Sequence, residues 1–108
     1  MKAISQEGDD LLWKENPDPD LKKDEVLIRI KASAINRADL LQRSGNYPVP
    51  PGASPILGLE CSGIVEEVGG QVENLIKGDE VCALLAGGGY AEKVSVPSGQ
   101  VLKVPKGF

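Results

Sequence analysis

The 108-residue chain contains no histidine and only two cysteines. Because zinc sites in proteins are built mainly from His and Cys, a zinc site here would lack most of its usual ligands. The absence of histidine also removes the base that most often activates a serine or cysteine nucleophile. A metal centre and a triad-type hydrolase are therefore poor explanations of this sequence.

Long apolar runs and basic clusters are also missing. No apolar run approaches the roughly 20 residues of a membrane helix, and Glu7, Asp9 and Asp10 interrupt the segment that a signal peptide would need to be apolar. Sixteen acidic residues against twelve basic ones give a net charge of -4, without a positive run for nucleic acid. We expect a cytoplasmic protein with neither nucleic-acid nor membrane partners.

The two cysteines, Cys61 and Cys82, are too few for a disulfide framework. Each lies in an apolar stretch, where a free thiol usually behaves as a small hydrophobic side chain. The sequence therefore predicts that both are buried free thiols.

Glycine and proline are plentiful, with thirteen and eight residues that separate short β-branched runs. This punctuation is typical of many short strands joined by turns. Residues 16–20, with two prolines, predict an extended surface connection. One mainly β domain is expected, a barrel with one short helix and one large loop. The expected strands are 2–5, 11–14, 26–34, 61–68, 80–86, 90–96 and 100–104.

The segment after the strand at 26–34 combines a helix signal with an irregular loop. Asn36 is a plausible N-cap for a short helix over 36–43. Residues 44–52 contain glycines and prolines that fix an ordered excursion, and ordered loops of this length are more often functional than merely connecting. A second glycine-rich segment, 86–90, lacks the G-x-G-x-x-G spacing of a phosphate site and is expected to form a flexible hairpin turn.

A resemblance rests on these motifs in order: NRADLLQRSGNYPVPPGAS, ILGLE, SGIVEEVG and KGDEVCALLAGGGYAEKVSVP. Together they resemble the N-terminal segment of the zinc-free medium-chain quinone oxidoreductases, the zeta-crystallin-like family. Zinc-dependent relatives have a cysteine near the position of Asn36 and a histidine at that of Leu59. The resemblance therefore indicates the zinc-free branch and implies that no residue here binds a metal.

The resemblance implies a partly open GroES-like β-barrel with one or two short helices. Residues 1–108 would be the substrate-side domain of a reductase that transfers a hydride from NADPH to a quinone. The Rossmann domain and the C-terminal return segment would be absent from this sequence, so the fragment alone would be inactive. A homodimeric parent and a monomeric or weakly dimeric fragment are expected. Two alternatives stay open: an alkenal or enone reductase of the same superfamily, and a non-enzymatic GroES-like binding module.

By the same resemblance, Asn36 and Tyr47 are the candidate catalytic and cofactor-binding residues at the nicotinamide end of the cleft. An amide and a phenol suit this role because both can stabilise the charge that a quinone oxygen gains. Each also has a simpler explanation, Asn36 as a helix cap and Tyr47 as a loop-packing aromatic. Glu60 matches a family acid whose role is structural without zinc, and Gly58 is a turn former and a candidate for close approach to the cofactor.

Overall fold

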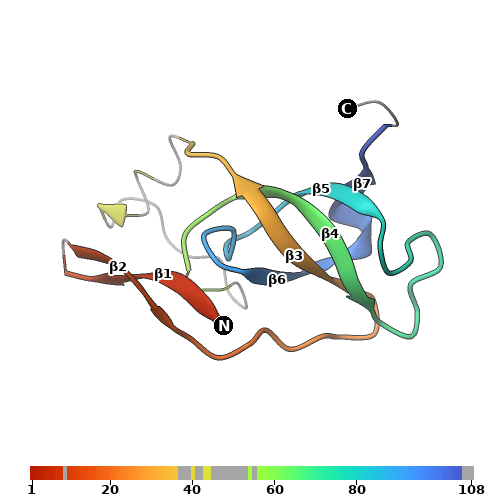
Figure 1. The fold of residues 1–108 in the computed structure, drawn as a ribbon, viewed down its shortest axis with the longest axis horizontal. Helices are drawn as coiled ribbons and strands as arrows, with labels where there is room; N and C mark the ends of the chain where they lie inside the picture. Colours follow the sequence, from red (N-terminus) through yellow and green to blue (C-terminus); the bar gives the residue numbers. More distant parts are fainter. Residues whose placement is uncertain (9, 37–39, 41–42, 45–53, 55, 106–108) are drawn as a thin grey trace.

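The computed structural model describes residues 1–8, 10–36, 40, 43–44, 54 and 56–105. Their strands form two sheets, and a short 3-10 helix lies near the C-terminal end (Figure 1). The elements are β1 (Lys2–Glu7), β2 (Asp10–Glu15), β3 (Glu25–Ser33), β4 (Glu60–Val68), β5 (Glu80–Leu84), β6 (Lys93–Pro97), η1 (Ser98–Gln100) and β7 (Val101–Lys103).

The larger sheet has five antiparallel strands in the order β6-β3-β4-β5-β7, and β1 and β2 form a separate hairpin. The hairpin is tied to the rest by a bridge between Ala3 and Ala91 and by the Ile4 amide, which donates to the Tyr90 carbonyl at 2.8 Å. Within the described residues the strands do not close into a barrel. The predicted mainly β, partly open fold is confirmed.

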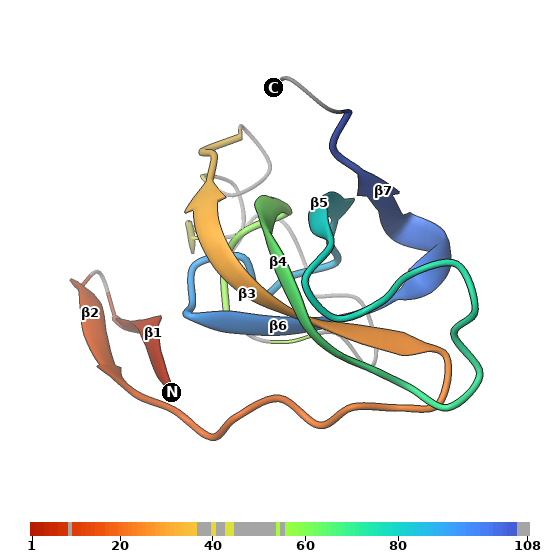
Figure 2. The same cartoon turned by 45° about the vertical axis from the view of Figure 1, so that its right-hand side comes forward.

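Strands β3 and β4 are long and curved, as the turned view shows (Figure 2). The pairing register shifts twice along β3, between Leu27 and Ile28 and between Ile30 and Ala32. An extra residue in one strand bends it and increases its twist, so these irregularities favour a curved sheet over a flat one. The curvature wraps the strands around one core.

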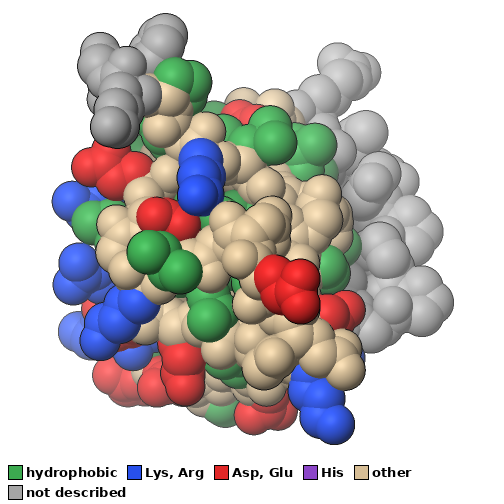
Figure 3. All heavy atoms as spheres, turned by 90° about the vertical axis from the view of Figure 1, so that its right-hand side faces the viewer, with side chains coloured by type: hydrophobic (Ala, Val, Ile, Leu, Met, Phe, Trp, Pro, Cys, Tyr) green, Lys and Arg blue, Asp and Glu red, His purple; other side chains and the backbone are tan. Residues whose placement is uncertain are grey.

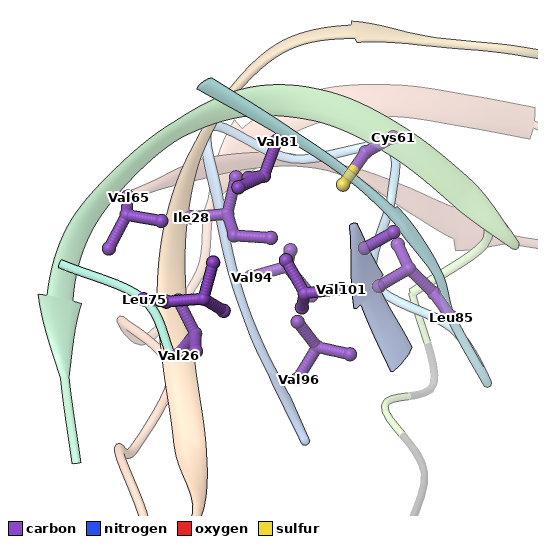
Figure 4. Packing of buried hydrophobic residues seen from close by; sticks show 11 residues of the cluster. Val26, Ile28, Cys61, Val65, Leu75, Val81, Leu85, Val94, Val96 and Val101 are labelled. Atoms are coloured by element: carbon purple, nitrogen blue, oxygen red, sulfur yellow. The ribbon is translucent and has the colours of Figure 1, made fainter. Parts of the chain in front are cut away.

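The core lies on the concave face of this sheet. Val26 and Ile28 of β3 are fully buried, whereas Arg29 between Ile28 and Ile30 is exposed, which is the predicted alternation of a half-buried strand. Leu75 and Leu85 add two side chains from connecting segments. Figure 4 shows how these side chains converge. The cluster comprises Val26, Ile28, Cys61, Val65, Leu75, Val81, Ala83, Leu85, Val94, Val96 and Val101.

Most strand predictions are confirmed with shifted ends. Strands β1 and β2 extend beyond the predicted 2–5 and 11–14, and residues 16–20 form the expected connection without regular structure. Strand β5 ends two residues before the predicted 86, and β6 begins at Lys93, after an expected start at 90. In the described part of the chain no helix is long and apolar enough to cross a membrane.

The prediction for the cysteines is half wrong. Cys61 is buried and both thiols are free, as expected, but Cys82 is exposed. The reason is register: Cys82 lies between Val81 and Ala83 on β5, and those two neighbours point into the core. Apolar surroundings in the sequence do not place a residue on the inner face of a strand.

The prediction of a flexible hairpin turn at 86–90 is also wrong. Strands β5 and β6 are not neighbours, because β6 pairs with β3 on the other side of the sheet. The segment between them crosses the molecule, and Gly87, Gly88 and Gly89 within it are buried. These residues pack against Ser54, Ile56 and Gly58.

Gly58 lies at the closest point of this packing. Its φ angle is +111°, and a Cβ built there would lie 2.6 Å from both the Cα of Gly89 and the backbone N of Tyr90. Gly58 therefore approaches the protein's own backbone closely, and its approach to a cofactor stays a prediction. Any side chain here must push the two segments apart.

We predict that Gly58→Ala destabilises the domain by about 3 kcal/mol or more, because it adds both a backbone clash and an unfavourable φ angle. Chemical denaturation followed by circular dichroism measures this change. Gly70→Ala is the matched control, since a Cβ at Gly70 would meet nothing within 4 Å. Equal stability of the two variants would contradict the tight packing at Gly58.

Candidate functional site

Asn36 lies shortly after the end of β3, with Ala34 and Ile35 between it and Ser33. The Leu40 amide donates to the Asn36 carbonyl at 3.4 Å, and the Ser44 amide donates to the Leu40 carbonyl at 3.1 Å. Bonds between residues four apart are those of an α-helix, and Leu40 and Arg43 have helical conformation. The described part of the predicted helix thus begins at Asn36, whose carbonyl position is that of an N-cap. Asn36 is half-buried.

Glu60 lies at the same end of the sheet. It is the first residue of β4, and the next residue, Cys61, pairs with Ser33 at the end of β3. Glu60 itself pairs with Leu84 at the end of β5. The ends of three adjacent strands therefore place the segment that leads to Asn36 beside the segment that precedes Glu60.

A groove of about 620 Å³ lies at this end of the sheet, between β3, β4, β5 and the η1–β7 segment. Its walls include Ala34, Cys82 and two leucines that are unusually exposed, Leu84 at 66% and Leu102 at 71%. Glu60 is the one charged side chain among the described residues that line it. Figure 3 shows the side of the molecule that carries β5 and β7, where hydrophobic side chains reach the surface. The groove is a predominantly apolar surface with one carboxylate.

The two predicted site residues differ in what the structure shows of their place relative to this groove. Asn36 follows the groove-lining Ala34 by two residues, but it is not itself part of the lining. Tyr47 lies outside the described residues. The catalytic and cofactor-binding roles of Asn36 and Tyr47 therefore stay predictions.

Sequence reasoning missed the groove walls, although β5 carries a signal for them. Val81 and Ala83 face the core, yet the alternate residues Cys82 and Leu84 are also apolar. A strand with one face in water normally has polar side chains on that face. Apolar residues on both faces of β5 indicate that its outer face is also a contact surface.

The described residues contain no group of three or more His, Cys, Asp or Glu side chains that could hold a metal ion. Burial raises the pKa of the Cys61 thiol to about 11, with a smaller contribution from Cys82. Cys61 is therefore protonated at neutral pH and a poor nucleophile or metal ligand.

Residues 22–106 match the alcohol dehydrogenase GroES-like domain. The chain belongs to this family. The GroES-like domain is 39% identical to the synaptic vesicle membrane protein VAT-1 homolog of Danio rerio over 90 residues, which are 83% of this chain and 19% of that protein. It is 35% identical to acryloyl-coenzyme A reductase of Sulfurisphaera tokodaii over 99% of this chain and 40% of that protein.

A solved structure of Escherichia coli quinone oxidoreductase complexed with NADPH matches 99% of this chain with a TM-score of 0.82 and 30% identity. The match covers 33% of that chain. The resemblance stated from the sequence is confirmed: the homologues are VAT-1 proteins and quinone oxidoreductases of the medium-chain dehydrogenase/reductase superfamily. The domain spans between about a fifth and two fifths of the length of these relatives.

We predict that a thiol reagent at neutral pH labels Cys82 rapidly in the folded domain and Cys61 only on unfolding. The exposure of Cys82, together with the burial and raised pKa of Cys61, favours this order. Mass spectrometry of the labelled peptides, with Cys82→Ser as the control, measures it. Early labelling of Cys61 would contradict its burial.

The raised pKa of Cys61 also affects stability. Because the folded-state pKa of Cys61 lies above its ordinary value of 9.0, its contribution to stability is present below pH 9 and falls as the pH rises toward about 11.

Proposed function

We propose that the GroES-like domain is the substrate-side part of a cytoplasmic, zinc-independent reductase that transfers a hydride from NADPH to quinones. The observation that carries this proposal is the likeness over nearly the whole chain to a quinone oxidoreductase solved with NADPH. The apolar groove beside the segment that leads to Asn36 supports it, because a flat and weakly polar acceptor suits such a surface.

The groove and the two candidate residues suit one end of NADPH better than the other. The nicotinamide ring is flat and has a carboxamide, which an apolar wall and the Asn36 and Tyr47 side chains would hold. The phosphates need cations or a cluster of backbone amides. The groove instead has the carboxylate of Glu60 as its charged lining residue among those described. We therefore assign the phosphates to a Rossmann domain elsewhere in the polypeptide, as the family resemblance implies.

NADPH supplies a hydride when bound, and with one proton from solvent a quinone becomes a hydroquinone. The quinone oxygen gains negative charge as the hydride adds. The side-chain N–H of Asn36 and the phenol of Tyr47 are assigned to donate hydrogen bonds to that oxygen. The walls at Leu84 and Leu102 exclude water and hold the acceptor in a fixed orientation. A quinone is electrophilic enough that these neutral donors suffice.

Reduction of an enone is the second candidate. It is favoured by the relative named acryloyl-coenzyme A reductase, which matches 99% of this chain. Quinones and enones both contain a carbon–carbon double bond conjugated to a carbonyl. The same donors would stabilise the same oxygen in both, so the acceptor is a question of affinity and fit.

The exposed leucines of the groove also bear on partners. Leu84 and Leu102 present apolar surface that a soluble protein normally covers. The bound acceptor would cover them in part, and we assign the remaining cover to the rest of a homodimeric reductase polypeptide. The 108 residues alone are then a monomer or a weak dimer.

We predict that the 108-residue chain alone binds NADPH no more tightly than millimolar and does not oxidise it when 1,4-benzoquinone is added. The reason is the missing phosphate contacts. Chemical-shift perturbation during an NADPH titration, followed by absorbance in the same sample, measures both quantities. Saturable micromolar binding centred on Asn36, with quinone-dependent oxidation, would show that the domain is a complete site.

We predict that Asn36→Ala and Tyr47→Phe, in the protein expressed from its full coding sequence, each lower kcat/KM for 1,4-benzoquinone roughly 10- to 100-fold. Each removes a donor to the charged oxygen. Asn74→Ala, at an exposed asparagine, is the matched control and is expected to change nothing. Thermal denaturation should shift by no more than about 2 °C in any of them. Unchanged kcat/KM in both site variants would overturn their assignment.

A further inference from the structure

Two side-chain hydroxyls tie the end of β3 to the buried glycine segment 87–90. The Ser33 hydroxyl donates to the Gly89 carbonyl at 2.5 Å, and the Tyr90 hydroxyl donates to the Ala34 carbonyl at 3.1 Å. Each bond joins residues 56 positions apart in the sequence. The two bonds run in opposite directions, one from each segment to the other.

These bonds lie where the hydrogen-bonded pairing of β3 with β4 ends. Ser33 is the last residue of β3 that pairs with β4. Ala34, Ile35 and Asn36 follow it, and the chain then turns into its helix. The position of Asn36 therefore depends on how the strand end just before it is held.

The glycine segment is in turn fixed to the chain that leads into Glu60. Three backbone amides donate across this contact: Gly88 to Ile56 at 2.8 Å, Gly89 to Gly58 at 3.0 Å, and Tyr90 to Leu57 at 2.9 Å. The segment 87–90 thus lies between the end of β3 and the chain that precedes β4, bonded by backbone to the latter and by hydroxyls to the former.

We infer that Ser33 and Tyr90 are positioning residues: their hydroxyls lock the end of β3 onto the glycine segment and thereby set where Asn36 lies relative to Glu60. This inference rests on the proposed function for its catalytic consequence. Neither residue belongs to the hydrophobic core cluster. Loss of either hydroxyl should therefore loosen the strand end without unfolding the domain.

The test uses the protein expressed from its full coding sequence and the variants Ser33→Ala, Tyr90→Phe and their combination. One hydrogen bond contributes about a fivefold factor, so each single variant is expected to lower kcat with NADPH and 1,4-benzoquinone by about that factor. KM for NADPH should stay within about twofold, because the phosphate end of the cofactor is bound elsewhere. Ser33→Thr keeps the hydroxyl and is expected to restore kcat.

Ser5→Ala is the matched control. The Ser5 hydroxyl is also partly buried and accepts a hydrogen bond from the side-chain amide of Asn16 at 3.0 Å, but it lies in β1. Ser5→Ala removes the same atom as Ser33→Ala at a position that does not hold the end of β3. The kcat of Ser5→Ala is expected to match that of the unmodified protein.

A second readout does not depend on activity. Hydrogen–deuterium exchange followed by mass spectrometry should become about fivefold faster in peptides that cover 33–40 when Ser33 or Tyr90 loses its hydroxyl, and should stay unchanged in β5 and β6. If exchange at 33–40 and kcat both stay at the unmodified values, or if exchange rises over the whole sheet, the positioning role is overturned. If the unmodified protein reduces neither quinones nor enones, the proposed function fails, and the exchange pattern alone then decides whether the two hydroxyls hold the strand end.

Discussion

The close contact between the backbones at Gly58 and Gly89 is the constraint on which the site end of this domain depends. A Cβ at Gly58 would lie 2.6 Å from Gly89, and one at Gly89 would lie 3.0 Å from Gly58, so neither position has room for a side chain. The packed valines of the sheet determine where β3 and β4 run. The glycine contact determines where the segments beyond those strands lie, and the candidate residues Asn36 and Glu60 are found at just those ends.

Strand β5 shows how one element serves both the fold and the site. Its inward residues, Val81 and Ala83, close the core, and its outward residues, Cys82 and Leu84, form a groove wall. The two faces are coupled because the strand period of two residues fixes both at once. A shift of register by one residue would bring the thiol of Cys82 into the core and remove the groove wall, so the burial of Val81 also specifies the shape of the groove.

The sequence predicted those features that local patterns determine. The alternation of Val26, Ile28 and Ile30 with the residues between them predicted β3. The capping residue Asn36 predicted the start of the helix. The glycine run at 86–90 was misjudged because its partners lie about thirty residues earlier in the chain, and no local pattern shows that a turn is buried. The roles of Ser33 and Tyr90 were invisible for the same reason. The outer face of β5 was foreseeable, since both of its phases are apolar.

Among the described residues, the ionisable groups with perturbed pKa values do not supply an acid to the groove at neutral pH. The Met1 ammonium and the Asp18 carboxylate stabilise each other's charged forms through a hydrogen bond of 2.7 Å, which raises the pKa of the first and lowers that of the second. The Cys61 thiol keeps its proton because burial raises its pKa. Hydride transfer to an electrophilic acceptor does not require a strong acid, but it does require the reacting atoms to be held close and in line. For the proposed reductase, the contacts that fix a strand end are therefore expected to affect the rate through positioning. The bonds of the glycine segment to both strand ends are contacts of that kind.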